Sequence, residues 1–240
     1  MSINSRFVVA SIEARMTSTR LPGKVLLPCV GRPMLELMVE RVSRSRYIDT
    51  IVIATTVNKT DDPIVELAQR LGVRFFRGSE FDVVGRVTNA MQEAKADVIV
   101  QLTSDCPLID PEIIDQLVRI YAANDFDHVS NAIVRSYPDG LDVQVSSLPI
   151  LEKCYALCEN DKDREHLFYT VRRNEDKIKT FKLLAPPELC WPQWRWTLDT
   201  QDDYRRICRI YEQFYPTKPA FSSSDIAEFM LSQPNLTPSR

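Results

Sequence analysis

Short runs of apolar, β-branched residues alternate along the chain with longer segments in which apolar residues recur every three or four positions. The first pattern is typical of buried strands and the second of amphipathic helices. In the first 125 residues, the predicted strands are Phe7–Ile12, Ile51–Thr55, Val73–Arg77 and Asp97–Leu102. A helix is predicted after each strand, at Pro33–Arg46, Asp61–Leu71, Phe81–Ala94 and Pro111–Ala123. Strand–helix units in succession predict a mostly parallel sheet covered by helices on both faces.

Residues at the helix ends support these boundaries. Pro33 suits the first turn of its helix, because the amide hydrogen that proline lacks would have no partner there. Asp61 or Asp62 can cap the second helix, and Gly72 follows its end. Asp110 is expected to cap the fourth helix.

The pattern changes after residue 125. Strands are predicted at Asp127–Asn131, at Asp142–Ser147, near 178–184 and at Trp194–Leu198. Helices are predicted at about 148–158, at 163–173, at Thr200–Phe214 and near 223–232. No internal repeat, low-complexity tract or linker divides the sequence. We therefore expect a single domain of the α/β class over residues 1–240.

Composition excludes several classes of protein. With 240 residues, 44% of them hydrophobic, one domain can bury enough surface to fold without disulfides or a structural metal. A net charge of −3 argues against a general nucleic-acid-binding protein. No apolar run approaches the ~18 residues of a membrane span, and the N-terminal residues lack the features of a signal peptide. The six cysteines are scattered, with no C-x-x-C motif, which favours a cytoplasmic protein without a structural zinc site.

Glycine-rich nucleotide-binding motifs are absent from the sequence. The chain has six glycines and two histidines, His128 and His166. None of the patterns G-x-G-x-x-G, G-x-x-x-x-G-K-[ST] and G-x-S-x-G occurs. A dinucleotide-binding protein, a P-loop NTPase and an enzyme with a nucleophile elbow are therefore disfavoured.

A loop rich in cations follows the first predicted strand. Residues Glu13–Lys24 include Arg15, Arg20 and Lys24, with hydroxyl groups at positions 17, 18 and 19. In open parallel sheets, ligands bind beyond the carboxyl ends of the strands. Cations, hydroxyls and exposed amides at this place suit a polyphosphate, which needs charge neutralisation and many hydrogen-bond donors. A solvated basic loop is the alternative interpretation.

Two carboxylates follow other predicted strands. Asp105 comes after the fourth strand, and Asp199 comes after Trp194–Leu198. Mg²⁺ usually takes one or two protein carboxylates and completes its coordination with phosphate oxygens and water. Both residues are therefore candidate magnesium ligands. The alternatives are a turn-capping role for Asp105 and, equally well supported, a helix-capping role for Asp199 beside Thr200.

Several motifs, taken together, resemble one known family. They are Ile12–Lys24 with its sequence R-L-P-G-K, Asp61–Val65, Phe76–Ser79, Asp105–Pro111, Tyr137–Asp142, Arg164–His166 and Arg195–Asp199. In this order they resemble the sugar-nucleotide cytidylyltransferases, which include the CMP-Kdo and CMP-sialic acid synthetases. The similarity is greatest to the SpsF-like proteins of spore coat polysaccharide biosynthesis, and it extends from about residue 7 to residue 215.

The resemblance implies a three-layer α/β/α fold of the nucleotide-diphospho-sugar transferase type, which is Rossmann-like with a mostly parallel sheet. It also implies a single nucleotidyltransferase domain. Residues 1–125 would form its nucleotide-binding half. Residues 126–240 would bind the acceptor and could form a dimer interface.

The same resemblance assigns roles to individual residues. The catalytic residues would be Arg15, Lys24 and Asp105, and the metal ligands would be Asp105 and Asp199. The acceptor would contact Asp142, Arg164, Glu165 and His166. The nucleotide would contact residues at three strand ends, namely Ala14, Arg15, Met16, Thr17, Ser18, Arg20, Gly23, Lys24, Arg77, Gly78 and Ser104.

The implied reaction is the transfer of CMP from CTP to a sugar, an acid sugar or a sugar phosphate, with release of pyrophosphate. The implied cofactor is Mg²⁺, and the implied partners are CTP and a small sugar-type acceptor, with no nucleic acid and no membrane. The product would serve surface glycan or polysaccharide biosynthesis, and the enzyme would be a cytoplasmic homodimer. Glu13, Thr17 and Gly85 depart from the family, which tends to have Gln, Gly and a polar residue such as Asp at these positions. These departures leave the preferred nucleotide and the acceptor open.

Two other functions are compatible with the sequence. A glycosyltransferase on the related fold would use a nucleotide-sugar donor, but such enzymes usually carry an Asp-x-Asp motif. The corresponding stretch here, Ser104-Asp105-Cys106, has a single Asp. A non-catalytic nucleotide-binding homologue is the other alternative, and the departures at Glu13 and Gly85 are its only support.

Overall fold

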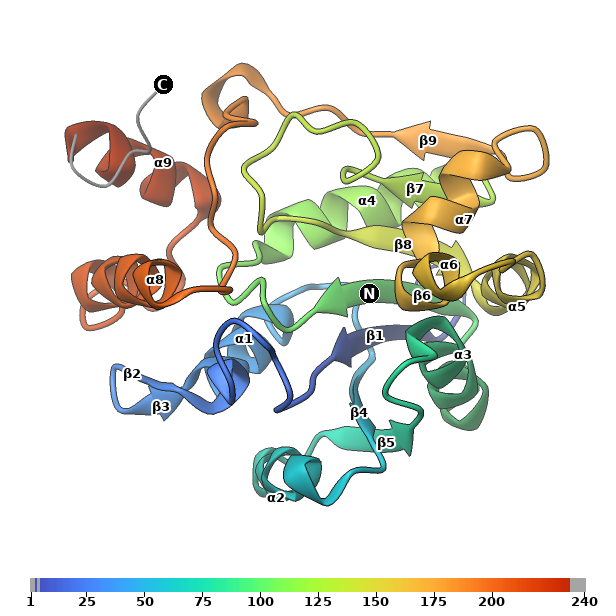
Figure 1. Cartoon of the computed structure of the whole chain (residues 1–240). Helices are drawn as coiled ribbons and strands as arrows, with labels where there is room; N and C mark the ends of the chain where they lie inside the picture. Colours follow the sequence, from blue (N-terminus) through green and yellow to red (C-terminus); the bar gives the residue numbers. More distant parts are fainter. Residues whose placement is uncertain (1–2, 4, 234–240) are drawn as a thin grey trace.

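A seven-stranded sheet runs through the centre of the molecule (Figure 1). The computed structural model describes residue 3 and residues 5–233. In spatial order the strands are β5 (Arg74–Gly78), β4 (Thr50–Thr56), β1 (Val8–Glu13), β6 (Val98–Thr103), β8 (Gln144–Ser147), β7 (His128–Ser130) and β9 (Thr180–Lys182). Within this sheet β8 alone runs antiparallel to its neighbours. The structure therefore confirms a mostly parallel sheet. A short hairpin, β2 (Pro28–Cys29) and β3 (Arg32–Pro33), stands apart from it.

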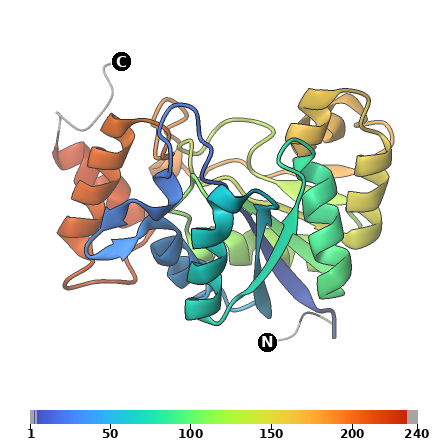
Figure 2. The same cartoon turned by 60° about the horizontal axis from the view of Figure 1, so that its bottom comes forward.

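Helices cover both faces of this sheet and complete the three-layer α/β/α fold. One face packs against α1 (Met34–Val42), α2 (Asp62–Leu71), α4 (Pro111–Ala123), α8 (Gln201–Phe214) and α9 (Ser223–Ser232). The other face packs against α3 (Val83–Ala94), α5 (Leu148–Ala156) and α7 (Leu167–Arg173), with α6 (Asp161–Glu165) beside α3. Figure 2 shows α8 and α9 gathered at one end of the molecule and α5 and α7 at the other.

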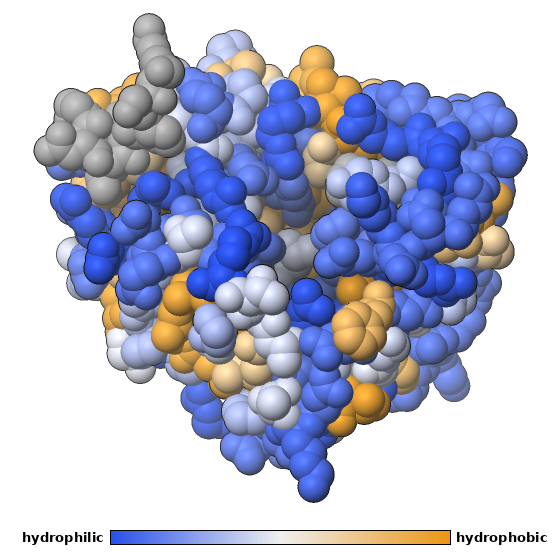
Figure 3. Space-filling model, viewed as in Figure 1, coloured by the Kyte–Doolittle hydropathy of each residue, from blue (hydrophilic) through white to orange (hydrophobic). Residues whose placement is uncertain are grey.

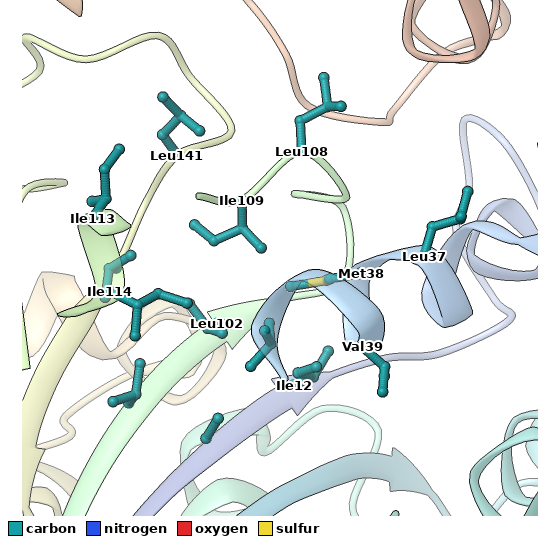
Figure 4. Packing of buried hydrophobic residues seen from close by; sticks show 14 of the residues in the cluster. Ile12, Leu37, Met38, Val39, Leu102, Leu108, Ile109, Ile113, Ile114 and Leu141 are labelled. Atoms are coloured by element: carbon teal, nitrogen blue, oxygen red, sulfur yellow. The ribbon is translucent and has the colours of Figure 1, made fainter. Parts of the chain in front are cut away.

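Alternation along the strands divides the apolar residues between two cores. In β1, Val8 and Ile12 belong to the core on the α1 side, whereas Val9 belongs to the core on the α3 side. Figure 4 shows Met38 of α1 close to Ile12 and to Leu102, which lies near the end of β6. This packing fixes the ends of the two central strands, and those ends carry the site described below.

The α3 side of the sheet becomes polar towards the carboxyl ends of the central strands. In β1, Ser11 and Glu13 follow Val9 on this side. Gln101 of β6 lies opposite Ser11 on one side and opposite Gln144 of β8 on the other. The apolar core therefore gives way to a row of polar side chains where a ligand can approach.

The predicted strand at Trp194–Leu198 is wrong. A single bridge, between Arg195 and Asp139, pairs this segment with another part of the described chain. Its hydrogen bonds run from Asp139 N to Trp194 O (2.9 Å) and from Trp196 N to Asp139 O (2.6 Å). The edge of β6 that such a strand would need is already occupied by β8.

Two helix predictions also need correction, whereas two caps are confirmed. The helix predicted at 163–173 is two helices, α6 and α7, separated at His166, whose backbone is extended. Helix α1 ends at Val42, before the polar segment that follows it. Asp110 caps α4 by accepting a hydrogen bond from Glu112 N, and Thr200 caps α8 in a capping box.

None of the helices within residues 3 and 5–233 combines the length and the apolar character needed to cross a membrane. The expectation that the chain has no signal peptide rests partly on residues 1, 2 and 4, which lie outside the described residues.

Candidate active site

Two adjoining cavities open at the carboxyl ends of the parallel strands. The first, called the loop cavity here, has a volume of about 330 Å³ and follows the loop after β1. The second, called the acidic cavity, has a volume of about 230 Å³ and lies between the ends of β6 and β8 and the segment 197–199. Figure 3 shows this face of the molecule hollowed at its centre and surrounded mostly by hydrophilic residues.

The two cavities share one wall. Both are lined by Glu13, Thr103, Asp105, Glu165, His166 and Asp199. The loop cavity is completed by Ala14, Arg15, Ser18, Thr19, Arg20, Lys24, Val83, Arg86 and Ser104. The acidic cavity is completed by Gln101, Cys106, Ala132, Asp139, Asp142, Gln144 and Thr197. A larger cavity, of about 400 Å³, lies between the starts of α4 and α9 and contains none of the predicted site residues.

A buried carboxylate holds the loop after β1 in place. Asp61 is fully buried, and its Oδ1 accepts a hydrogen bond from Met16 N at 2.8 Å. Its Oδ2 accepts hydrogen bonds from the hydroxyls of Thr55 and Thr56, at 3.1 and 2.6 Å. The loop is closed by Gly23, whose positive φ of 69° suits glycine and whose amide donates to Met16 O at 2.9 Å. These bonds bring Lys24 back to the ends of the strands.

Oppositely charged side chains converge at the shared wall. Lys24 Nζ lies 2.8 Å from Asp199 Oδ1 and 3.7 Å from Asp105 Oδ2. Arg20 also pairs with Asp199, at 2.9 Å, and Arg195 pairs with its other oxygen. Burial raises the pKa of Asp199, but the bond from Lys24, with Arg20 and Arg195, lowers it by more, so the net pKa is below its usual value. Asp199 is therefore a fixed negative charge.

Asp105 and Asp199 come together through the backbone rather than through strand pairing. Leu198 N donates to Asp105 O at 2.7 Å, which places Asp199 beside the end of β6. The Asp105 side chain accepts a hydrogen bond from Thr103 Oγ1 at 2.6 Å. The arrangement that a strand at 194–198 was expected to produce thus arises from a loop contact.

Two carboxylates that face one cation are a suitable donor set for a divalent metal. Within the described part of the chain, no group of three or more His, Cys, Asp or Glu side chains could hold a metal ion. Asp105 and Asp199 do converge on the Lys24 ammonium. Since Mg²⁺ needs only one or two protein carboxylates when phosphate oxygens supply further ligands, this pair fits it.

The carboxyl group of Glu13 has an unusually high pKa. Burial raises the pKa of Glu13 to about 7, although a hydrogen bond from Gln101 and the charge of Arg86 act in the opposite direction. Arg86, on the first turns of α3, is itself buried and donates to Ser79 O at 2.5 Å. Glu13 was expected only as a departure from the family, and Arg86 was not predicted as a site residue.

Most of the predicted site residues line the two cavities. The loop cavity contains Ala14, Arg15, Ser18, Arg20, Lys24, Ser104, Asp105 and Asp199. Glu165 and His166 line both cavities, and Asp142 lines the acidic cavity. The residues of the acidic cavity that were not predicted are Glu13, Gln101, Thr103, Cys106, Ala132, Asp139, Gln144 and Thr197. Glu13, Cys106, Asp139 and Thr197 lie within the family motifs but were given no role, and no motif contains the others.

The remaining predicted residues lie nearby but do not line either cavity. Met16 and Gly23 shape the loop through their backbone bonds. Thr17 donates to Glu80, in the loop between β5 and α3. Gly78 ends β5.

Arg77 and Arg164 are engaged elsewhere. Arg77 donates to Thr56 O at 2.8 Å and pairs with Asp62 at 2.7 Å, so it ties β5 to the segment after β4. Arg164 pairs with Asp82, at 3.3 Å, on the cap of α3. Their predicted contacts with nucleotide and acceptor remain predictions.

Comparison with known proteins agrees with this geometry. A family model described as "Cytidylyltransferase" matches residues 9–186. The chain is 38% identical over 209 residues to the uncharacterized protein MJ1063 of Methanocaldococcus jannaschii, covering 86% of this chain and 84% of that protein. It is 33% identical over 238 residues to the spore coat polysaccharide biosynthesis protein SpsF of Bacillus subtilis, covering 95% and 96% of the two chains.

A solved structure extends the likeness to the whole fold. The structure of a cytidylyltransferase from Leptospira borgpetersenii matches with a TM-score of 0.92 and 34% identity, covering 98% of each chain. The residues that the family model matches, 9–186, include all those that line the two cavities except Thr197 and Asp199. The chain therefore belongs to the cytidylyltransferase family, and its function is the transfer of CMP from CTP to an acceptor.

Proposed function

We propose that this enzyme is a Mg²⁺-dependent cytidylyltransferase that binds CTP in the loop cavity and a small sugar-type acceptor in the acidic cavity. The observation that carries the proposal is the charged cluster of Lys24, Asp105 and Asp199 on the wall shared by the two cavities. An acceptor hydroxyl in one cavity and a triphosphate in the other would meet at this wall. The hydroxyl oxygen would attack the α-phosphorus of CTP, and pyrophosphate would leave.

The residues of the loop cavity suit the charge of the triphosphate. Arg15 and Lys24 would offset negative charge on the α-phosphate and on the leaving pyrophosphate. Backbone amides of the loop would donate further hydrogen bonds. Positioning of two substrates and stabilisation of charge account for this chemistry without a covalent intermediate.

Asp105 and Asp199 would hold the metal. Bound Mg²⁺ would polarise phosphate oxygens and the attacking hydroxyl. Arg20 and Arg195 remain to pair with Asp199 when Lys24 turns to a phosphate oxygen, so the carboxylate keeps its charge.

The wider setting is also a proposal. The name and high coverage of the SpsF relative support a role in surface glycan or polysaccharide biosynthesis. We infer a cytoplasmic homodimer, in which residues 126–240 supply the interface.

Pyrophosphate release tests the proposed function. The protein is mixed with Mg²⁺, each of the four nucleoside triphosphates and a panel of sugars, acid sugars and sugar phosphates. CTP is expected to give the fastest release, and Asp105→Asn is expected to abolish it without lowering the melting temperature. Asp202→Asn, at an exposed residue paired only with Arg205 among the bonds of the described chain, is the matched control. No release with CTP, or full activity of Asp105→Asn, would contradict the proposal.

A further inference from the structure

The acidic cavity presents many hydrogen-bond acceptors. Apart from the two proposed metal ligands, four carboxylates line it, at Glu13, Asp139, Asp142 and Glu165. Carboxylates and amide oxygens accept hydrogen bonds, and they attract ligands that donate them. A ligand that fills this cavity must therefore supply donors.

Three buried polar atoms of residues that line this cavity have no protein partner, and one of them is Gln144 Oε1. Gln101 is only 7% exposed, and its Nε2 donates to Glu13, while its Oε1 has no partner. Thr197 is only 6% exposed, and its Oγ1 also has no partner. Buried polar atoms are almost always hydrogen-bonded, because an unmade bond is costly. These atoms point to a polar ligand as the missing partner.

Positive charge is scarce on the side of the acceptor. Among the described residues that line the acidic cavity, His166 is the one side chain that can become a cation. Arg135 does not line the cavity. Its guanidinium donates to both oxygens of Asp142, at 2.5 and 2.9 Å, and pairs with Asp139 at 3.2 Å. Lys24, Arg20 and Arg195 all converge on Asp199. Apart from His166, and from Arg86 on the side of the loop cavity, no described cation is therefore placed to neutralise a carboxylate of an acceptor in this cavity.

We propose that the acceptor is an amine-bearing sugar, whose ammonium group lies against Glu13, rather than a sugar acid. The inference rests on the proposed function. The ammonium would form a charge-assisted hydrogen bond with Glu13, and its other hydrogens or neighbouring hydroxyls would reach Gln101 Oε1 and Thr197 Oγ1. A carboxylate in the same place would lie among four acidic side chains, of which only Asp139 and Asp142 are paired with Arg135, so the cavity discriminates against it by repulsion.

Matched acceptor sets test this inference. Each set consists of three sugars that differ at one position, which carries an amine, a hydroxyl or a carboxylate; glucosamine, glucose and glucuronate form one such set. Binding is measured by calorimetry with the wild-type protein saturated with Mg²⁺ and a non-hydrolysable CTP analogue, and turnover by pyrophosphate release from CTP. In at least one set, the amine is expected to bind about 10-fold or more tightly than the carboxylate, as one ion pair of about 1.4 kcal/mol would give.

Two variants identify the residue responsible. Glu13→Gln keeps the shape of the side chain and removes its charge, so the preference for the amine is expected to fall to about 3-fold or less. Gln101→Arg adds a cation to the cavity and is expected to shift the preference towards the carboxylate sugar. Glu152→Gln is the control, because Glu152 is bonded to Gln92 outside both cavities. The melting temperature of each variant shows whether it is folded, and either variant alone decides the question.

The outcomes separate this inference from the function on which it rests. Tighter binding of carboxylate sugars, equal binding of the three members of every set, or no binding of any of them would overturn the inference. A preference for the amine that survives in either folded variant would overturn the role of Glu13. Preferential binding of amines without pyrophosphate release from any set would leave the inference standing and contradict the proposed function.

Discussion

At the scale of single residues, one buried carboxylate determines the shape of the loop cavity. Asp61 accepts hydrogen bonds from the loop backbone at Met16 and from two threonine hydroxyls of β4. Because the carboxylate is fully buried, each of these donors would be left without a partner if it were lost. The sequence places Asp61 at a helix start, and its position there is correct, but its side chain makes no capping bond.

Asp61→Asn is expected to destabilise the protein by about 2–4 kcal/mol, because an amide nitrogen would face buried donors. The free energy of unfolding, from denaturant titration, measures this effect. Asp62→Asn is the control. Asp62 is half exposed and forms a surface ion pair with Arg77, so about 1 kcal/mol or less is expected there. Equal losses in the two variants would contradict the role assigned to Asp61.

Lys24→Met is expected to lower pyrophosphate release by about 100-fold or more, because a buried cation at the reacting phosphate is lost. The fold should persist, since Asp199 keeps its pairs with Arg20 and Arg195. Lys218→Met removes an exposed lysine that pairs with Asp225 and serves as the control. Turnover within about 3-fold of wild type, measured at saturating CTP, would show that Lys24 is not catalytic.

At the scale of elements, the wall of the acidic cavity depends on a close approach of two loops. The segment before β8 crosses the backbone of residues 194–197 at Gly140, which has a φ of 116°. A Cβ at this position would lie 2.7 Å from the carbonyl carbon of Trp196 and 2.9 Å from Thr197 N. Only glycine fits both the dihedral angle and the space.

Gly140→Ala is therefore expected to cost about 3 kcal/mol or more in unfolding free energy, and to weaken acceptor binding because Asp139 and Asp142 flank this turn. Gly72→Ala is the matched control. Gly72 also has a positive φ, of 67°, but a Cβ there meets no atom within 4 Å, so about 1 kcal/mol is expected. Thermal and chemical unfolding of the two variants provide the comparison.

The order of elements could be predicted because local signals agree with the final packing. Apolar runs, Pro111 at a helix start and the caps at Asp110 and Thr200 all act within a few residues. The strand expected at Trp194–Leu198 could not be excluded from sequence, since its apolar residues are buried by packing against distant loops rather than by pairing. Whether a segment finds a free strand edge depends on which strand occupies that edge in the folded protein, here β8.

At the scale of the whole molecule, two buried groups make stability depend on pH in opposite directions. Burial lowers the pKa of His128 to about 4, against a smaller opposing contribution from Gln144. The unfolded state therefore binds more protons than the folded state between about pH 4 and 6.5, and stability rises with pH in that window. The raised pKa of Glu13, about 7, has the opposite effect between about pH 4.5 and 7.

His128→Asn separates these contributions. The stability difference, wild type minus variant, is expected to increase by up to about 1.4 kcal/mol per pH unit between about pH 4 and 6.5 and to be constant above pH 7. Glu13→Gln is the counterpart, and its difference curve should fall with pH between about 4.5 and 7. Urea titrations at half-unit pH steps give both curves. A flat curve for His128→Asn would mean that the imidazole titrates normally in the folded state.

The candidate site was predictable where it depends on contiguous motifs. The loop Ala14–Lys24 and the strand tip at Asp105 lie where the sequence indicated, because carboxyl ends of parallel strands meet at one edge. The site was not predictable where it depends on the pairing of β8 with β6, which sets Gln144 opposite Gln101. Arg86 could not be predicted as a site residue, because a single arginine that is buried within a helix belongs to no sequence motif.

The shared wall has a consequence for how the two substrates bind. Glu13, Asp105 and Asp199 border both cavities, so whatever occupies one cavity changes the electric field in the other. A polyanion on one side would release Lys24 from the carboxylates and leave the opposite side more negative. Thermodynamic reciprocity then requires that each substrate alter the affinity of the other by the same factor. With a cationic acceptor, bound CTP would raise the affinity for the acceptor, and the bound acceptor would raise the affinity for CTP. In the absence of CTP, the acceptor would bind weakly.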